Sequence, residues 1–145
     1  MLPIDKRLLW ALVLWLFSST ALAADLEVEN PRLRLLPGDL PAAGYYGLRN
    51  TSDETMVLVG AQSPAFARVM LHRSVEDDGQ VQMRHVPRLV IESGDSVDFA
   101  PGGYHLMLME RSRPLAVGDE VTVTLEFEDG RRLPVAFRAV SPASL

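Results

Sequence analysis

The chain has 145 residues, of which 48% are hydrophobic and 23% charged, and it carries a formal net charge of −5. This length supports one domain, and the composition is that of a globular chain, not a disordered one. The acidic balance argues against nucleic acid as a partner, because phosphate binding needs clustered Lys and Arg. The chain contains no Cys, which excludes disulfides, iron–sulfur clusters, thiol catalysis and blue-copper electron-transfer centres.

The N-terminus has the layout of a secretory signal peptide. A basic pair precedes ten unbroken apolar residues, and small residues follow. These features predict a leader over residues 1–23 that is cleaved between Ala23 and Ala24. The apolar run is short for a membrane span, which needs about 20 residues, so an uncleaved anchor is the alternative. Without a Cys near the cleavage point no lipid anchor is expected, and residues 24–145 are expected to form one exported, periplasmic domain.

Short strand patterns follow one another through the rest of the chain. Turn signals rich in Gly, Pro, Asn and Asp separate them, and no window holds a convincing 3.6-residue apolar stripe. The clearest strand alternates Val121, Val123, Leu125 and Phe127 with Thr and Glu. In chain order, the expected strands cover residues 26–35, 44–49, 55–61, 67–73, 80–86, 96–100, 104–110, 121–127 and 133–137. Eight or nine short strands at this spacing predict an all-β domain, an antiparallel sandwich or Greek-key barrel.

The chain lacks the sequence signatures of common enzymes. Ser, His and Asp are present, but no Gly-x-Ser-x-Gly elbow joins a strand to a helix. The segment Pro101-Gly102-Gly103 precedes a predicted strand and not a helix, so it does not form a phosphate-binding loop. Asp77 and Asp78 belong to the charged stretch 76–79, which indicates a solvated turn. We therefore do not expect an enzyme.

The histidines and methionines form the most informative pattern. Alternation along three predicted strands places them together on one face of each strand: His72 with Met70, Met83 with His85, and His105 with Met107 and Met109. Imidazole and thioether together suit Cu(I), because soft sulfur favours a soft monovalent ion. Zinc would ask for thiolates or carboxylates, and calcium or magnesium for clustered oxygens. The pattern leaves two alternatives open: a metal site, or Met in the core and His on the surface.

The spacing of four of these residues resembles a known motif. Ten residues separate His72 from Met83, twenty-one separate Met83 from His105, and one separates His105 from Met107. This spacing matches the PCuAC family of periplasmic copper chaperones. The likeness extends from about Leu26 to Val140 and includes the segments Ala42–Tyr45, Leu48–Asn50, Leu58–Gly60, Ser63–Pro64, Leu71–His72, Pro101–Met109, Arg113–Leu115 and Gly118–Asp119.

The resemblance implies a cupredoxin-like β-barrel with one Cu(I) site whose ligands are His72, Met83, His105 and Met107. It also implies a chaperone that delivers copper to a protein recipient, and we expect the chaperone to be a monomer. The recipient would be the CuA-bearing subunit of cytochrome c oxidase or another periplasmic copper chaperone. The alternatives are a copper buffer or resistance protein without a dedicated recipient, and a metal-free secreted β-sandwich that binds a protein partner.

Several residues near this set have a second interpretation. Met70 could cap the site, although packing is favoured, and His85 could be a secondary or Cu(II) ligand, although a surface role is favoured. Met109 is expected to run into the barrel. Tyr45, Tyr46 and Tyr104 are expected to be structural, although each could pack beside copper.

Two departures from the family pattern stand out. Pro31-Arg32 occurs near the point where the N-terminal strand of the family commonly carries Trp. No tail rich in His and Met follows Val140, so a Cu(II) site built from such a tail is not expected.

Overall fold

The computed structural model describes residues 25–145, and the predicted leader over residues 1–23 lies outside them. In chain order the elements are β1 (Leu26–Arg34), β2 (Ala42–Asn50), β3 (Met56–Gln62), β4 (Phe66–Asp77), β5 (Gln80–His85), β6 (Leu89–Ile91), β7 (Ser96–Phe99), β8 (Tyr104–Arg111), β9 (Glu120–Phe127), β10 (Arg132–Val140) and the 3-10 helix η1 (Pro142–Ser144). The all-β class is confirmed. The sequence does not predict β6, because three residues are too few to show an alternation.

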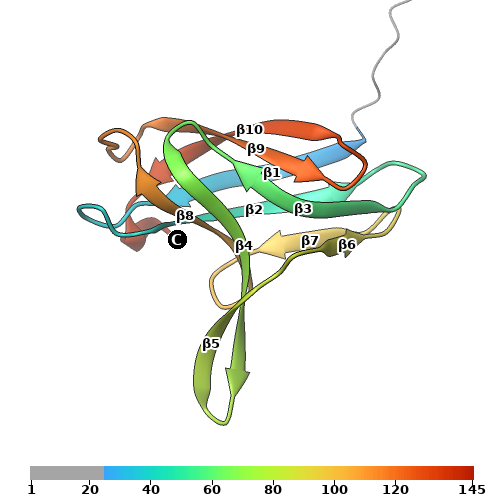
Figure 1. The fold of residues 1–145 in the computed structure, drawn as a ribbon, viewed down its shortest axis with the longest axis horizontal. Helices are drawn as coiled ribbons and strands as arrows, with labels where there is room; N and C mark the ends of the chain where they lie inside the picture. The colour runs from blue at the N-terminus through green and yellow to red at the C-terminus, as the bar shows by residue number, and fades with distance from the viewer. Residues whose placement is uncertain (1–24) are drawn as a thin grey trace, which may run out of the picture.

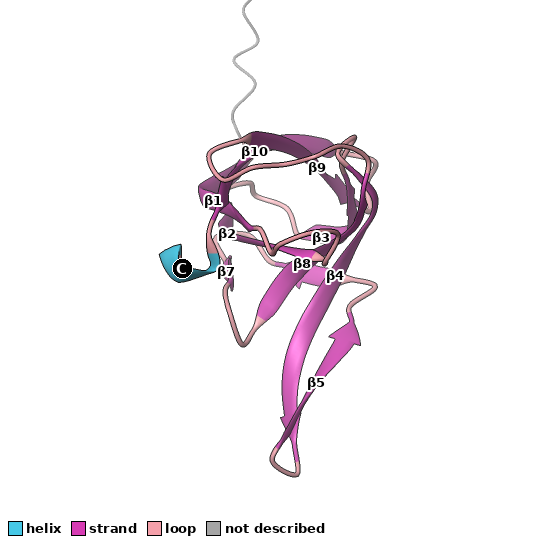
Figure 2. Ribbon diagram, turned by 90° about the vertical axis from the view of Figure 1, so that its left-hand side faces the viewer, coloured by secondary structure: helices cyan, strands magenta, loops and turns pink. Residues whose placement is uncertain are grey.

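All ten strands belong to one sheet, in the order β5-β4-β8-β7-β2-β1-β10-β9-β3-β6. The sheet curls round into a barrel, which is seen end-on in Figure 2. Most neighbouring strands are antiparallel, but β1 runs parallel to β10, and β7 parallel to β8. The sequence predicts an antiparallel arrangement, but the sheet is mixed. The first and last strands of the chain, β1 and β10, lie side by side and run in the same direction. Within residues 25–145, no helix is long and apolar enough to cross a membrane.

The inner surface of the sheet encloses one apolar core. On β4 and β8 it is formed by Leu71, Leu106 and Leu108, each no more than 2% exposed. Tyr46 stacks on Phe99 with ring centroids 4.2 Å apart. Burial of such apolar area is the main force that holds a domain of this size together. Because side chains alternate along a strand, the residues between these leucines lie on the outer face.

β4 and β5 form a hairpin that projects from the barrel (Figures 1 and 2). β4 continues to Asp77, so the assignment of residues 76–79 to a turn is wrong for its first two residues. The turn itself is Asp78-Gly79, whose φ angles are 48° and 75°. Two positive φ values are what a type I′ turn requires, and such a turn matches the twist of the two strands it joins. The hairpin carries β5 to the free edge of the sheet, where all its residues are exposed.

β1 contains a bulge at the position where the sequence departs from the family pattern. Its register against β2 shifts between Glu29 and Arg32, and Asn30 has a φ of 48°. Pro31 cannot donate to a sheet ladder, and a bulge accommodates such a residue. Beyond the bulge, Leu33 points into the core. Arg32 and Arg34 therefore lie on the outer face of the sheet, beside β2, which in turn pairs with β8.

Candidate metal centre

Three neighbouring strands, β8, β4 and β5, bring the His and Met residues to one outer face of the sheet. His72 lies opposite His105 on one side and opposite His85 on the other. A row here means residues that lie opposite one another across neighbouring strands. Two residues from His72 along β4, in either direction, the next rows on this face place Met70 opposite Met107 and Ser74 opposite Met83. The four residues expected as ligands therefore lie within three adjacent rows of the ladder, although they are as far as 35 positions apart in the sequence.

A depression of about 160 Å³ lies between these strands and β2. Met83, His105 and Met107 line it, together with Arg34, Pro41, Ala42, Ala43, Tyr45, Ser74 and Gly102. Met83 approaches it from outside and is 57% exposed, whereas His105 is only 4% exposed. The structure thus brings three of the four expected ligands around one space.

His72 adjoins this group through its ring contact with His105. The two ring centroids lie 5.9 Å apart, with the ring planes at 83°. A bond of about 2 Å from nitrogen to metal puts each ring centre about 3 Å from the ion, so two imidazoles on one ion lie up to about 6 Å apart. His72 and His105 are therefore at a separation that a single ion can span.

The hydrogen bonding of His105 leaves one ring nitrogen free for a metal. Its Nδ1 lies 3.2 Å from the carbonyl oxygen of Gly103. A carbonyl only accepts, so Nδ1 carries the proton and donates it, and Nε2 keeps its lone pair. That Nε2 is buried and has no partner among the described residues. Buried polar atoms are nearly always paired, so an unpaired basic nitrogen at a depression is a position for a ligand.

His72 presents a second such nitrogen. Its Nδ1 is also buried without a hydrogen-bond partner within residues 25–145. Burial lowers the pKa of His72, and repulsion from the other two imidazoles lowers it further. Burial also lowers the pKa of His105; the hydrogen bond to Gly103 opposes that shift, and the charge of Arg34 adds to it. Both shifts favour the neutral ring, which is the form that binds a metal.

Met70 and Met109 lie apart from the depression that Met83 and Met107 line. Met109 does not run into the barrel as the sequence predicts: it lies on the outer face, where Arg68 donates to its sulfur at 3.9 Å. Leu108 takes the core position beside it. Met70 is half-buried opposite Met107 and lines a separate cavity with Arg68.

Among the tyrosines, Tyr45 is the one that borders the site. Tyr46 and Tyr104 both pack against Phe99, as expected for structural aromatics. The guanidinium of Arg34 lies 5.7 Å from the centre of the Tyr45 ring, a cation–π distance. Sequence reasoning misses Arg34 altogether, because only the register of β1, β2 and β8 reveals that it reaches the depression.

The donor chemistry of this face is restricted. The described part of the chain holds no group of three or more His, Asp or Glu placed to bind a metal together. The sulfur donors that line the depression are the thioethers of Met83 and Met107, beside the imidazole of His105. Two nitrogens and two thioether sulfurs form a soft, neutral ligand set, which suits Cu(I).

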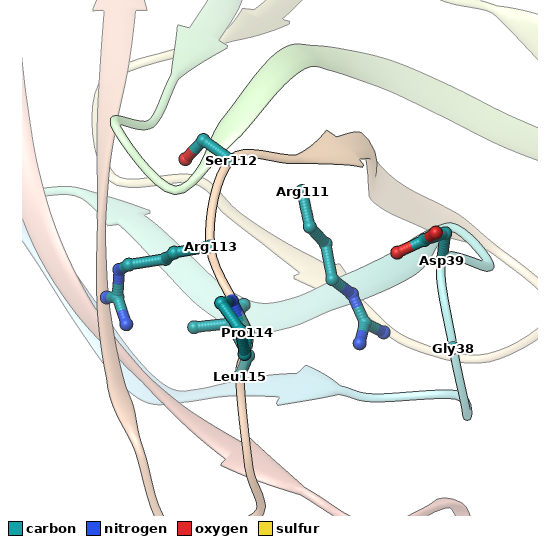
Figure 3. A pocket seen from close by; sticks show the side chains of 7 residues that line it. All are labelled: Gly38, Asp39, Arg111, Ser112, Arg113, Pro114 and Leu115. Carbon is teal, nitrogen blue, oxygen red and sulfur yellow. The ribbon is translucent and has the colours of Figure 1, made fainter.

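A larger cavity, of about 470 Å³, opens at the far end of β8. It is lined by Gly38, Asp39, Arg111, Ser112, Arg113, Pro114 and Leu115 (Figure 3). Arg111 donates to the carbonyl oxygen of Leu36 at 2.7 Å, which fastens the loop before β2. This cavity has no His or Met in its lining, so its size does not make it the metal centre.

Most of the chain is similar to known proteins. Residues 26–139 match the family described as putative lipoprotein LpqE-like. The putative lipoprotein Lxx21020 of Leifsonia xyli subsp. xyli is 38% identical over 95 residues, which are 65% of this chain and 57% of that protein. The uncharacterized protein RP573 of Rickettsia prowazekii is 34% identical over 89 residues, or 61% of this chain and 49% of that protein. The matches thus span about half the length of these relatives.

Solved structures extend the comparison to the fold. The solution structure of the Cu(I) form of DR1885 from Deinococcus radiodurans has a TM-score of 0.64 and 34% identity, and the match covers 84% of each chain. The copper-bound PCuAC domain from PmoF2 has a TM-score of 0.68 and 26% identity, covering 81% of this chain and 94% of that domain. The chain therefore belongs to the LpqE-like family, and its domain is of the PCuAC type.

Proposed function

We propose that this protein is a periplasmic copper chaperone that binds one Cu(I) ion through His72, Met83, His105 and Met107. One observation carries the proposal: two buried imidazole nitrogens that have no hydrogen-bond partner within residues 25–145 lie beside a depression lined by two methionines. The relatives described as copper-bound support it, one of them at 34% identity. Further support comes from the pattern of a leader over residues 1–23, cleaved between Ala23 and Ala24, which would export the chain.

The ligand set favours the monovalent ion. Imidazole and thioether are neutral, so they add no negative charge that would stabilise a divalent ion more than a monovalent one. In addition, Cu(II) prefers harder nitrogen and oxygen donors. Arg34 lies in the lining of the same depression. Its positive charge repels a divalent ion about twice as strongly as a monovalent one at the same position. Both effects stabilise Cu(I) relative to Cu(II).

The exposure of the ligands suits transfer of the ion to another protein. His105 and Met107 belong to a central strand, whereas Met83 lies on the edge strand and is largely exposed. We propose that a ligand of the recipient replaces Met83 first, while the deeper residues still hold the ion. The recipient would be a copper protein such as the CuA-bearing oxidase subunit or another periplasmic chaperone, and the donor would act as a monomer. On this proposal copper is cargo, and the protein is not an enzyme.

A Cu(I) titration of the purified protein against a chromophoric Cu(I) chelator tests the binding site. We expect the protein to withdraw one equivalent of Cu(I), and the Met83→Ala/Met107→Ala variant to withdraw almost none. Met109→Ala is the matched control, because its sulfur contacts Arg68 and not the depression, and it should behave as the wild type does. A folded wild type that fails to compete with the chelator would support the metal-free interaction module instead.

Transfer to a recipient separates a chaperone from a copper buffer. The Cu(I)-loaded protein is mixed with an apo CuA domain, and the purple absorption of the assembled centre is followed in the presence of reductant and the further copper that the centre needs. Transfer faster than through free copper, tested with a competing chelator, supports a dedicated chaperone. Transfer that the chelator abolishes supports the buffer.

A further inference from the structure

We propose a second metal position on the same sheet face, at its free edge, where His72 and His85 together bind a divalent ion, and Cu(II) most strongly. The three histidines form one row across β8, β4 and β5, with His72 in the middle. The Cu(I) site described above uses His72 with His105. The edge position uses the same His72 with the imidazole on its other side.

The ladder between β4 and β5 favours a shared ion at this pair. The N–H of Val86 donates to the carbonyl of Leu71 at 2.8 Å, so Leu71 and Val86 form a hydrogen-bonded pair. The adjacent pair, His72 and His85, is therefore a non-hydrogen-bonded one, in which Cα atoms approach to about 4.5 Å and the side chains lie closer together. The two ring centroids are 6.2 Å apart, with planes at 79°. Two imidazoles on one ion need about 6 Å or less, so small rotations suffice.

Both rings have nitrogens available for coordination. The Nδ1 of His72 is buried and unpartnered within residues 25–145. His85 is exposed on the edge strand, where solvent reaches it from the open side of the sheet. Water can therefore complete the coordination sphere of an ion held by two imidazoles. Such a site is open, in contrast to the depression beside it.

The donor type decides which ion prefers this position. Two imidazoles with water offer nitrogen and oxygen, and among divalent first-row ions such a set binds Cu(II) most strongly. Arg34 borders the depression beside His105, not the edge. Arg73 and Arg84 follow and precede the two histidines in sequence, so alternation turns them to the opposite face. A divalent ion is thus less opposed by charge at the edge than inside.

Because the two positions share His72, only one of them can be complete at a time. The row of histidines then sorts copper by oxidation state: Cu(I) with His105 and the methionines, Cu(II) with His85. While the Cu(I) position is empty, Cu(II) would be retained at the edge without occupying the depression.

Titration of the apo protein with copper(II) chloride, followed by electron paramagnetic resonance, tests the edge position. We expect one equivalent of Cu(II) with coupling to imidazole nitrogen. His85→Ala should weaken this binding by about tenfold or more, equivalent to about 1.4 kcal/mol. Met107→Ala is the matched control and should leave it unchanged. In a parallel Cu(I) titration, His85→Ala should keep the wild-type affinity, which also shows that the variant is folded.

Three outcomes would overturn the edge position. One is a wild type that binds no Cu(II). Another is equal binding of Cu(II) by His85→Ala, which would place the ion elsewhere, for example at the amino terminus. The third is loss of Cu(II) binding in Met107→Ala, which would place Cu(II) in the depression. Failure of the Cu(I) titration alone would contradict the proposed chaperone and would leave the Cu(II) result to be judged separately.

Discussion

The two faces of β8 carry two kinds of buried residue, and burial has opposite effects on their contribution to stability. Leu106 is 0% exposed and His105 is 4% exposed, and they are neighbours in the chain. Leu106 points into the apolar core, where burial itself stabilises the fold. His105 points outward, where burial leaves Nε2 without a partner among residues 25–145 and therefore costs stability in the absence of a ligand. Burial alone does not distinguish a core from a site; burial of an unpaired donor or acceptor does.

Removal of the core side chain on this strand should cause the largest change in stability. We expect Leu106→Ala to lower the free energy of unfolding by about 2–5 kcal/mol, because it deletes buried methyl groups and leaves a cavity. Urea unfolding followed by circular dichroism measures this change. The slope of the transition should stay the same while its midpoint falls. A loss well under 1 kcal/mol would mean that the core collapses readily around the missing side chain.

His105→Ala should have the opposite profile. We expect Cu(I) affinity to fall by about a hundredfold, equivalent to nearly 3 kcal/mol, because one of the four proposed ligands is lost. The free energy of unfolding should change little, since the Gly103 carbonyl still accepts the N–H of Ser74 at 3.1 Å. Chelator competition and urea unfolding on the same preparation separate the two effects. Unchanged Cu(I) affinity would remove His105 from the ligand set.

Arg34→Gln sharpens the contrast by changing charge without touching a ligand. The positive charge of Arg34 contributes to lowering the pKa of His105, so its removal should raise that pKa. A several-fold gain of Cu(II) affinity relative to Cu(I) should accompany it, because a divalent ion was repelled more. Proton NMR of the imidazoles and the copper reduction potential measure the two effects. Arg138→Gln, on β10, is the matched control and should leave both values unchanged.

The smallest expected effect is on the pH dependence of the apo protein. The pKa values of His72 and His105 are lowered from 6.5 in the folded state. As pH falls through 6.5, the unfolded chain takes up protons first, so the free energy of unfolding decreases until the folded pKa values are passed. Urea unfolding above and below pH 6.5 measures this decrease. It should shrink in His72→Ala/His105→Ala, and persistence of the full decrease in that variant would assign it to other groups.

The fold was largely accessible from the sequence because its strands alternate clearly. Nine predicted strands correspond to strands of the sheet, whereas β6 was too short to recognise. The length of β4 was underestimated because Glu76 and Asp77 suggest a solvated turn, yet both are exposed positions of a projecting hairpin. The parallel neighbours β1 and β10 depend on how the sheet closes, which no local pattern encodes.

The site was accessible in part. Alternation places His105 and Met107 on one face, as the structure has them, and the structure brings His72 and Met83 of the same motif to neighbouring positions of that face. The contribution of Arg34 was not accessible, because it depends on a bulge in another strand and on the register with β2. The expectation for Met109 fails for a different reason: alternation places Met109 on the face of His105 and Met107, and an expectation that it runs into the barrel departs from that rule. Only the contact of its sulfur with Arg68 depends on the neighbouring strand.

The projecting hairpin has a consequence for local unfolding. Among the strands of residues 25–145, β5 pairs only with β4, and all residues of β5 are exposed. Its amide hydrogens should therefore exchange with solvent at low opening free energy. Met83 is the one proposed Cu(I) ligand on that strand. A bound ion would link β5 to β8, so that the edge strand would open only together with the barrel and not by itself. Copper would then slow amide exchange along β5 far more than in the barrel, and the release of Met83 would restore the fast exchange.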